Sequence, residues 1–190
     1  MEMIVAKLTN LRVAVLATDG FEEAELTEPV KALKEAGAQV EILSTKSGQI
    51  QAFRHHDKST TVNVDRVIDE AQASEYDAVL LPGGVLNADM LRMGPKVQSF
   101  LQQMQQAGKP FAVICHAPWV LISANLVQGR TLTSYYTIQD DISNAGGNWV
   151  DREVVVDGNW VTSRQPDDIP AFNREMLNLF AQFAPTASAS

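Results

Sequence analysis

The sequence predicts an α/β fold in which a mainly parallel sheet carries helices on both faces. Residues 13–17, 78–81 and 111–114 are continuous apolar runs (VAVLA, AVLL and FAVI), as is typical of parallel strands buried on both sides. Residues 21–36 and 96–107 lie between such runs and have helical patterns. Strands that alternate with helices favour a parallel sheet between two helical layers.

The elements of the N-terminal half follow from local patterns. Pro29 lies inside the helical stretch 21–36 and is expected to kink it or to start its main segment. Residues 40–44 predict a second strand. Residues 55–65 alternate Thr, Val and Asn, which favours an extended ribbon, and residues 67–73 are a candidate short helix.

The C-terminal third contains the strongest hairpin signal in the chain. Residues 153–163 place two apolar runs around an Asp-Gly pair, which is a preferred two-residue turn. Before the hairpin, residues 131–135 predict a strand and residues 138–145 a helix. After it, Asp167 or Asp168 is expected to cap a last helix that reaches about residue 183.

Composition indicates a single globular domain over residues 1–190, with a structured core at about 12–183 and a frayed tail at 185–190. The chain is 45% hydrophobic and 20% charged, with a net charge of -8 and a pI near 4.8. This balance argues against a nucleic-acid partner, and no apolar run is long enough to span a membrane. The first residues lack the pattern of a signal peptide, so we expect a cytoplasmic location.

Cys115 is the only cysteine, and it directly follows the apolar run 111–114. Residues 117–124 read as a helix with Pro118 in its first turn, so the cysteine falls on the corner between strand and helix. Such a corner strains the backbone and exposes the side chain at the top of the sheet. The helix N-terminus is expected to lower the pKa of the thiol. The alternative is a buried structural cysteine.

Three segments with unusual residues are expected to converge at the carboxyl ends of the strands, where ligands bind in such sheets. They are residues 20–25, residues 82–84 (PGG) and the pair Cys115-His116. The N–H groups of Gly83, Gly84 and His116 could form an oxyanion hole. The alternative for the glycines is an ordinary turn at the end of a strand.

Two side chains could assist the thiol. Glu25 lies between Ala24 and Leu26 and could point inward, where its carboxyl would have a raised pKa and share a proton with the sulfur. Glu22 and Glu23 could serve only to complement the helix dipole. His116 could act as a base, although it could also be a helix-start residue without a catalytic task.

No metal or other cofactor is expected. His55, His56 and Asp57 form a polar cluster, but the histidines are neighbours rather than at the spacing of metal ligands on a helix. The aromatic residues Tyr135, Tyr136, Trp119 and Trp160 are more typical of core or interface positions than of ligand stacking.

Several of these motifs, taken together and in order, resemble the PfpI/ThiJ family of the class I glutamine amidotransferase-like superfamily, which includes the Parkinson-disease deglycase. The resemblance runs from about residue 12 to residue 180 and is nearest to PfpI-type intracellular proteases and YhbO-like stress proteins. It is carried by residues 21–25 (FEEAE), 81–84 (LPGG), 112–118 (AVICHAP), 140–146 (DDISNAG), 153–161 (EVVVDGNWV) and 162–164 (TSR).

The resemblance implies a flavodoxin-like sandwich with Cys115 as the nucleophile on an elbow, Glu25 hydrogen-bonded to its sulfur and His116 in support. It also implies homodimers or rings of dimers, in which an acidic residue from the neighbouring subunit completes a Cys-His-acid triad. Asp89 is the only acidic candidate after the glycine pair, one residue further along than in the family pattern. Trp119 stands where the family usually has a smaller polar residue.

These observations predict a stress-related, cysteine-dependent hydrolase of small carbonyl or acyl adducts, of the protease, deglycase or glyoxalase-like kind. A pocket at the end of a sheet suits a small adduct better than a long polypeptide, so weak peptidase activity is expected. The alternative is a redox-sensing or chaperone-like protein whose cysteine is oxidised rather than turned over.

Overall fold

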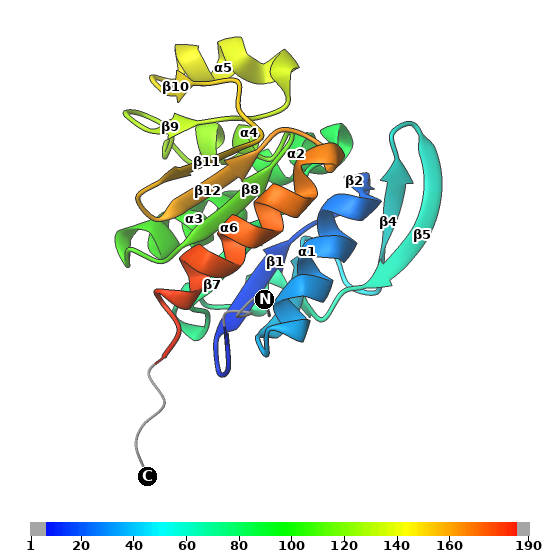
Figure 1. Ribbon diagram of the computed structural model, residues 1–190. Helices are drawn as coiled ribbons and strands as arrows, with labels where there is room; N and C mark the ends of the chain where they lie inside the picture. The colour runs from blue at the N-terminus through cyan, green and yellow to red at the C-terminus, as the bar shows by residue number, and fades with distance from the viewer. Residues whose placement is uncertain (1–6, 186–190) are drawn as a thin grey trace.

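The computed structural model describes residues 7–185, and a seven-stranded sheet forms its centre (Figure 1). The strand order is β11-β12-β8-β7-β1-β3-β6, and every neighbouring pair is parallel except β11 and β12. The flavodoxin-like α/β sandwich with a mainly parallel sheet, as expected from the sequence, is therefore present. The strands are β1 (Arg12–Leu16), β3 (Gln39–Ser44), β6 (Arg66–Val67), β7 (Ala78–Leu81), β8 (Phe111–Ile114), β11 (Val154–Asp157) and β12 (Trp160–Ser163).

Helices cover both faces of this sheet. Figure 1 shows α1 and α6 on the near face and α2, α3 and α4 behind the strands. The near-side core includes Val13, Val15 and Phe172, whereas the far-side core includes Ala14 and Leu16, as the alternation of side chains along β1 requires. The helices are α1 (Glu23–Glu35), α2 (Val85–Arg92), α3 (Pro95–Gln106), α4 (Pro118–Ser123), α5 (Gln139–Asn144) and α6 (Ile169–Ala181).

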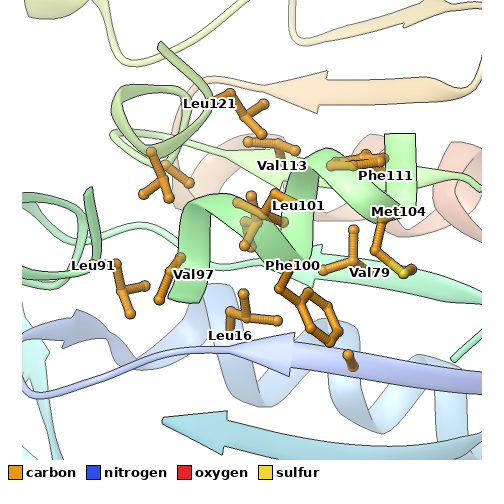
Figure 2. Close-up of a cluster of buried hydrophobic side chains, with 14 of the residues drawn as sticks. Leu16, Val79, Leu91, Val97, Phe100, Leu101, Met104, Phe111, Val113 and Leu121 are labelled. Carbon is orange, nitrogen blue, oxygen red and sulfur yellow. The ribbon is translucent and has the colours of Figure 1, made fainter. Parts of the chain in front are cut away.

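The far-side core is built around α3, as Figure 2 shows. Val97, Phe100, Leu101 and Met104 recur at helical spacing, and all four are at most 2% exposed against the strands. Burial of four such side chains contributes on the order of several kcal/mol to folding. The helix fixes the sheet from one side and so supports the strand ends that carry the candidate site.

Two small sheets extend the sandwich. β2 (Phe21–Glu22), β4 (Gln49–Arg54) and β5 (Asp57–Asn63) form a three-stranded sheet, and Figure 1 shows the β4–β5 hairpin projecting at one side. β9 (Thr131–Leu132) pairs in parallel with β10 (Asn148–Trp149) near α5.

Most predicted elements are confirmed, with boundary shifts of a few residues, and the extended ribbon expected at 55–65 is β5 (Asp57–Asn63), the second half of a hairpin. Three expectations need correction. The helix expected at 67–73 is reduced to the 3₁₀ turn η1 (Ile68–Glu70). The predicted strand 131–135 is reduced to β9 (Thr131–Leu132). Asp168 stands at the N-cap of α6, but its carboxylate accepts hydrogen bonds from Arg164 instead of capping the helix.

One helix was missed altogether. α2 (Val85–Arg92) directly follows the glycine pair and has many exposed apolar side chains, so its sequence lacks an ordinary amphipathic pattern. The 3₁₀ turns η2 (Ala73–Glu75), η3 (Tyr136–Ile138) and η4 (Pro166–Asp168) complete the elements. Among residues 7–185, no helix combines the length and apolar character that crossing a bilayer requires. Residues 186–190 of the expected tail lie outside the described part of the chain.

Candidate active site

Cys115 occupies a strained corner between β8 and α4. Its φ angle is 66°, a left-handed value that is uncommon for any residue with a side chain and that costs about 1–3 kcal/mol. Hydrogen bonds on both sides hold this geometry: the Cys115 N–H donates to the Ser163 carbonyl (3.0 Å), and its carbonyl accepts from the Tyr135 N–H (2.9 Å). The predicted elbow is therefore confirmed. The side chain is only 7% exposed, so the expectation of an exposed thiol is wrong.

Glu25 is fully buried beside this thiol, as its apolar neighbours in α1 predicted. Its carboxyl lies against the Cys115 thiol and the backbone of Gly83, yet neither oxygen makes a well-formed hydrogen bond. Burial is the main cause that raises the pKa of Glu25 to about 8, and the charge of Glu22 adds to the effect. The carboxyl is therefore neutral at neutral pH, as expected from the sequence.

The glycine pair leaves the space in which these groups meet. A Cβ atom at Gly83 would overlap Glu25 Oε2 and the Cβ of Cys115, so any larger residue would push the carboxyl and the thiol apart. Gly84 has a φ of 96°, and a side chain there would meet the backbone of Gly20. Glycine is thus required at Gly83 by the approach of α1 and the cysteine corner, and at Gly84 by the approach of the loop after β1.

The expected low pKa of the thiol is not what this geometry produces. Burial raises the pKa of Cys115 above its ordinary value, and the charge of Glu25, when present, raises it further. The N–H groups of Gly84 and His116 point toward the sulfur and act in the opposite direction, but they do not outweigh burial. The dipole effect invoked from the sequence is weak here because α4 has only six residues.

His116 faces the thiol directly. Its Nδ1 lies 3.2 Å from Cys115 Sγ, so the two adjacent side chains are in contact. Burial lowers the pKa of His116 to about 4, which leaves the imidazole neutral, with one ring nitrogen unprotonated, at pH 7. A protonated thiol beside a neutral imidazole is the arrangement of a nucleophile with its general base.

Within residues 7–185, the contacts that orient this imidazole come from aromatic rings and not from a carboxylate. The ring of Tyr135 stacks on His116 at 4.8 Å between centroids, and the Trp119 ring makes a T-shaped contact with His116 at 5.3 Å between centroids. The second ring nitrogen, Nε2, lies 3.4 Å from Thr137 Oγ1. Tyr135 and Trp119 were expected to be ordinary core or interface residues, and their sequence positions gave no signal for this role.

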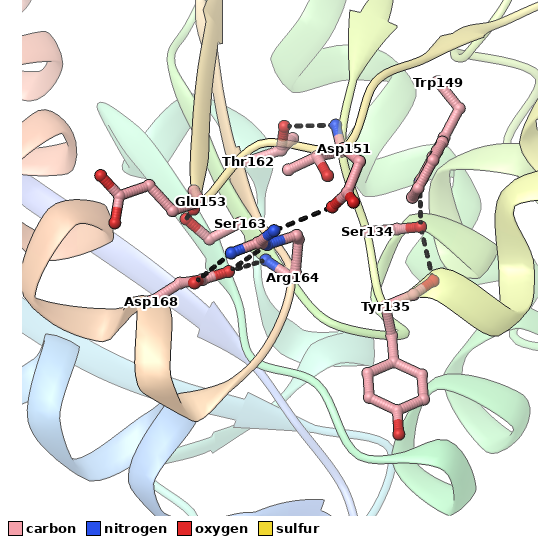
Figure 3. Close-up of polar contacts among 10 residues, drawn as sticks. Ser134, Tyr135, Trp149, Asp151, Glu153, Thr162, Ser163, Arg164 and Asp168 are labelled. Atoms are coloured by element: carbon pink, nitrogen blue, oxygen red, sulfur yellow. Dashed lines mark hydrogen bonds and ion pairs between the residues drawn. The ribbon is translucent and has the colours of Figure 1, made fainter.

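A network of polar contacts places the loops that carry these residues (Figure 3). Trp149 donates to Ser134 Oγ at 3.0 Å, and Ser134 donates to the Tyr135 carbonyl at 2.9 Å, which fixes the segment that stacks on His116. Arg164 binds Asp168 through two nitrogens and so shapes the turn at residues 165–167.

Asn87 is a further residue that sequence reasoning missed. Its buried side chain accepts a hydrogen bond from the Thr18 N–H (2.8 Å) and donates to the carbonyls of Pro82 (3.0 Å) and Gly83 (3.1 Å). It therefore ties the loop after β1 to the glycine turn after β7. An asparagine within a polar segment carries no sequence signal for such a bridge unless the missed helix is known.

The three segments expected to converge do meet, around a cavity of about 790 Å³. Glu25, Gly84, Cys115 and His116 all line it, together with parts of the β4–β5 hairpin and of residues 135–137 and 165–167. Asp89 does not: it lies exposed on α2, outside the cavity of its own chain.

The histidine pair considered as a metal cluster lies at the turn of the β4–β5 hairpin, and both His55 and His56 line the cavity. Within residues 7–185, no three or more His, Cys, Asp or Glu side chains are grouped as metal ligands would be. Both imidazoles form part of the cavity wall.

Comparison with known proteins agrees with this geometry. Residues 11–179 match the model of the DJ-1/PfpI family. The chain belongs to the DJ-1/PfpI family. It is 44% identical to Deglycase TK1284 of Thermococcus kodakarensis over 89% of this chain and 99% of that protein.

Two further family members illustrate the range of the likeness. General stress protein 18 of Bacillus subtilis is 43% identical over 88% of this chain and 96% of that protein. The crystal structure of Drosophila melanogaster DJ-1beta superimposes with a TM-score of 0.83 at 27% identity, over 93% of this chain and 91% of that one. Membership thus extends over nearly the whole described chain.

We predict that Asn87→Ala lowers the free energy of unfolding by roughly 2–4 kcal/mol, because it leaves the buried Thr18 N–H and Pro82 carbonyl without their partners, while the Gly83 carbonyl keeps only the Glu22 N–H. Urea denaturation measures the change. Lys31→Ala, an exposed position on α1, is the control and should change stability by less than about 0.5 kcal/mol. An equally small effect of Asn87→Ala would show that the bridge does not hold the turn.

We predict that Glu25→Gln leaves the rate of Cys115 alkylation by iodoacetamide within roughly tenfold of wild type below pH 8, because a neutral carboxyl and an amide both lack charge. Above about pH 8, wild type should become the slower protein, since ionised Glu25 then opposes the thiolate. Glu28→Gln, exposed on the same helix, should match wild type throughout. A variant far faster than wild type already at pH 6 would mean that Glu25 is charged at neutral pH.

Proposed function

We propose that the protein is a cysteine-dependent hydrolase that removes small carbonyl or acyl adducts, as a deglycase does. The observation that carries the proposal is the contact between Cys115 Sγ and His116 Nδ1 at 3.2 Å inside the cavity. The name of the Thermococcus kodakarensis relative, a deglycase, supports the same class of reaction. The name of the Bacillus subtilis relative supports a role under stress.

The proposed step on an acyl substrate uses groups of the chain in turn. His116 takes the thiol proton while Cys115 Sγ attacks the carbonyl carbon, and the carbonyl bond electrons move onto the oxygen. The N–H groups of Gly84 and His116, which point toward the sulfur, are near enough to receive that oxyanion. His116 then returns the proton to the leaving group, and water hydrolyses the thioester.

In this scheme Glu25 keeps the site free of a second negative charge. Its raised pKa of about 8 leaves it neutral, so a thiolate formed beside it meets a neutral carboxyl. The same carboxyl can donate a hydrogen bond to the sulfur once the thiol proton has gone to His116. Gly83 contributes by allowing the two side chains to approach.

The buried nucleophile also explains why weak peptidase activity is proposed. Cys115 is 7% exposed at the floor of a cavity, and an extended polypeptide would have to present its backbone there. A small adduct at the end of a flexible side chain reaches the same place without unfolding its carrier. A misplacement of the scissile bond by about an ångström costs on the order of a hundredfold in rate.

We further propose that two copies associate through α2. Val85, Leu86, Met90 and Met93 are between 50% and 75% exposed on or next to this helix, which is unusual for apolar side chains of that size. Val85 and Leu86 also line the cavity, so a partner seated on this face would close its rim.

Asp89 lies on the same exposed face of α2, and a two-fold contact would bring Asp89 of the partner subunit near the cavity. There it could orient His116, whose Nε2 meets only the Thr137 hydroxyl among the described side-chain contacts. The proposed triad is therefore Cys115, His116 and Asp89, with the acid supplied across the interface.

The redox-sensor alternative rests on an isolated cysteine paired only with Glu25. The contact between the thiol and His116 favours the enzyme over this alternative. Because the thiol of Cys115 is reactive under both proposals, a thiol-labelling experiment does not distinguish them. Catalytic turnover of a substrate does.

We predict that Cys115→Ala abolishes removal of an adduct formed by a small dicarbonyl on an amino acid, because the nucleophile is lost. His116→Ala should lower kcat by roughly 10²–10⁴-fold, the usual contribution of a general base. Asp89→Asn should lower kcat less, since it only orients the base. The measurement is adduct disappearance by mass spectrometry, with Glu70→Gln as an exposed control. Unchanged turnover by Cys115→Ala would overturn the hydrolase and favour the sensor.

We predict that wild type sediments as a dimer or larger assembly and that Met90→Lys shifts it toward the monomer, because a charge enters an apolar contact. Val156→Lys is the matched control: Val156 is 50% exposed on β11, away from α2, and its substitution should leave assembly unchanged. A monomeric wild type, or dissociation by Val156→Lys instead, would contradict the α2 interface.

A further inference from the structure

The cavity is lined by carboxylates that the proposed chemistry does not use. Glu22 is half-buried at the junction of β2 and α1, and Asp167 is exposed in η4 on a different side of the cavity. Among the described residues that line the cavity there is no lysine or arginine. Apart from these two carboxylates, its titratable side chains are Glu25, Cys115, Tyr135 and the histidines His55, His56 and His116.

The arginines that flank the cavity are already paired with other acids. Arg54, next to the hairpin turn, binds Glu23 at 2.9 Å. Arg164, one residue before the 165–167 segment, binds Asp168 at 2.9 Å and Asp151 at 2.8 Å, as Figure 3 shows. Neither guanidinium therefore makes an ion pair with Glu22 or Asp167 in the described residues.

The Glu22 side chain is held by a hydrogen bond, and its negative charge acts on Glu25, which lines the same cavity. The backbone N–H of His55 donates to Glu22 Oε2 at 3.0 Å, so the carboxylate is fixed at the mouth by the hairpin. The same carboxylate acts on Glu25, which is fully buried with neither oxygen hydrogen-bonded. The unpartnered carboxyl of Glu25 and the carboxylate of Glu22 thus belong to two residues that both line the space a ligand would fill.

We infer that the cavity selects positively charged ligands and that Glu22 and Asp167 determine this selectivity. Within the proposed function, on which this inference rests, the favoured substrates are adducts that retain an ammonium or guanidinium group. A partly apolar cavity concentrates the field of the charges on its walls, which raises the encounter rate of oppositely charged ligands and lowers that of ligands with the same charge. The net charge of -8 acts in the same direction at longer range.

The experiment measures how fast Cys115 reacts with three methanethiosulfonates: a cationic one (trimethylammonium-ethyl), an anionic one with a chain of the same length (sulfonatoethyl) and a smaller uncharged one (methyl). Each reacts with the thiolate to form a mixed disulfide and releases methanesulfinate. We expect the ratio of cationic to anionic rates to exceed that of a short uncharged cysteine peptide at the same pH and salt. Glu22→Gln and Asp167→Asn should each lower that ratio by roughly three- to tenfold, with little change for the uncharged reagent.

The control is Glu70→Gln, which removes the same net charge at an exposed position outside the cavity and should leave the ratio close to wild type. A ratio equal to that of the peptide, or one that falls equally in Glu70→Gln, would overturn the inference. Because labelling needs no turnover, the two proposals fail separately. Charge selection without any hydrolysis would refute the proposed function alone, and hydrolysis without charge selection would refute this inference alone.

Discussion

Two titratable groups, the Glu25 carboxyl and the Cys115 thiol, are buried against each other at the carboxyl end of the central sheet. The other features of the site follow from this contact. Glu25 is fully buried against Cys115, and burial keeps its pKa near 8. Among the described residues, no arginine or lysine forms an ion pair with Glu25. The pair therefore accommodates one negative charge but not two at neutral pH. A thiolate can form there only if the carboxyl keeps its proton and the thiol proton has somewhere to go, and His116, neutral and in contact with the sulfur, is that acceptor.

The backbone makes this crowding possible. Strands β7 and β8 end side by side, so the glycine turn and the cysteine corner meet, and α1 delivers Glu25 into the gap that Gly83 leaves. The strain at Cys115 is balanced by its hydrogen bonds to the neighbouring strand β12 and to Tyr135. Asn87 then ties the glycine turn to the loop after β1. Fold and chemistry thus depend on the same few close approaches.

The sequence predicted the parts of this arrangement that rest on strong local patterns. Buried strands are readable from continuous apolar runs, and the inward position of Glu25 from its apolar neighbours. Other parts depend on tertiary context. α2 was missed because its exposed apolar side chains break the helical pattern, and Asn87 was missed with it. The thiol pKa was misjudged because the sequence shows a helix start but not the depth of burial or the shortness of α4. Tyr135 reaches His116 only through a loop whose path no local pattern specifies.

The central claim is that Glu25 is protonated at neutral pH beside the thiol of Cys115. Infrared difference spectroscopy of wild type against Glu25→Gln, with the Glu25 carboxyl isotopically labelled, tests it most directly. The account predicts a protonated carboxyl stretch at pH 7 that is absent in the variant and that gives way to a carboxylate band as the pH passes about 8. A carboxylate band for Glu25 already present at pH 6 would contradict the account.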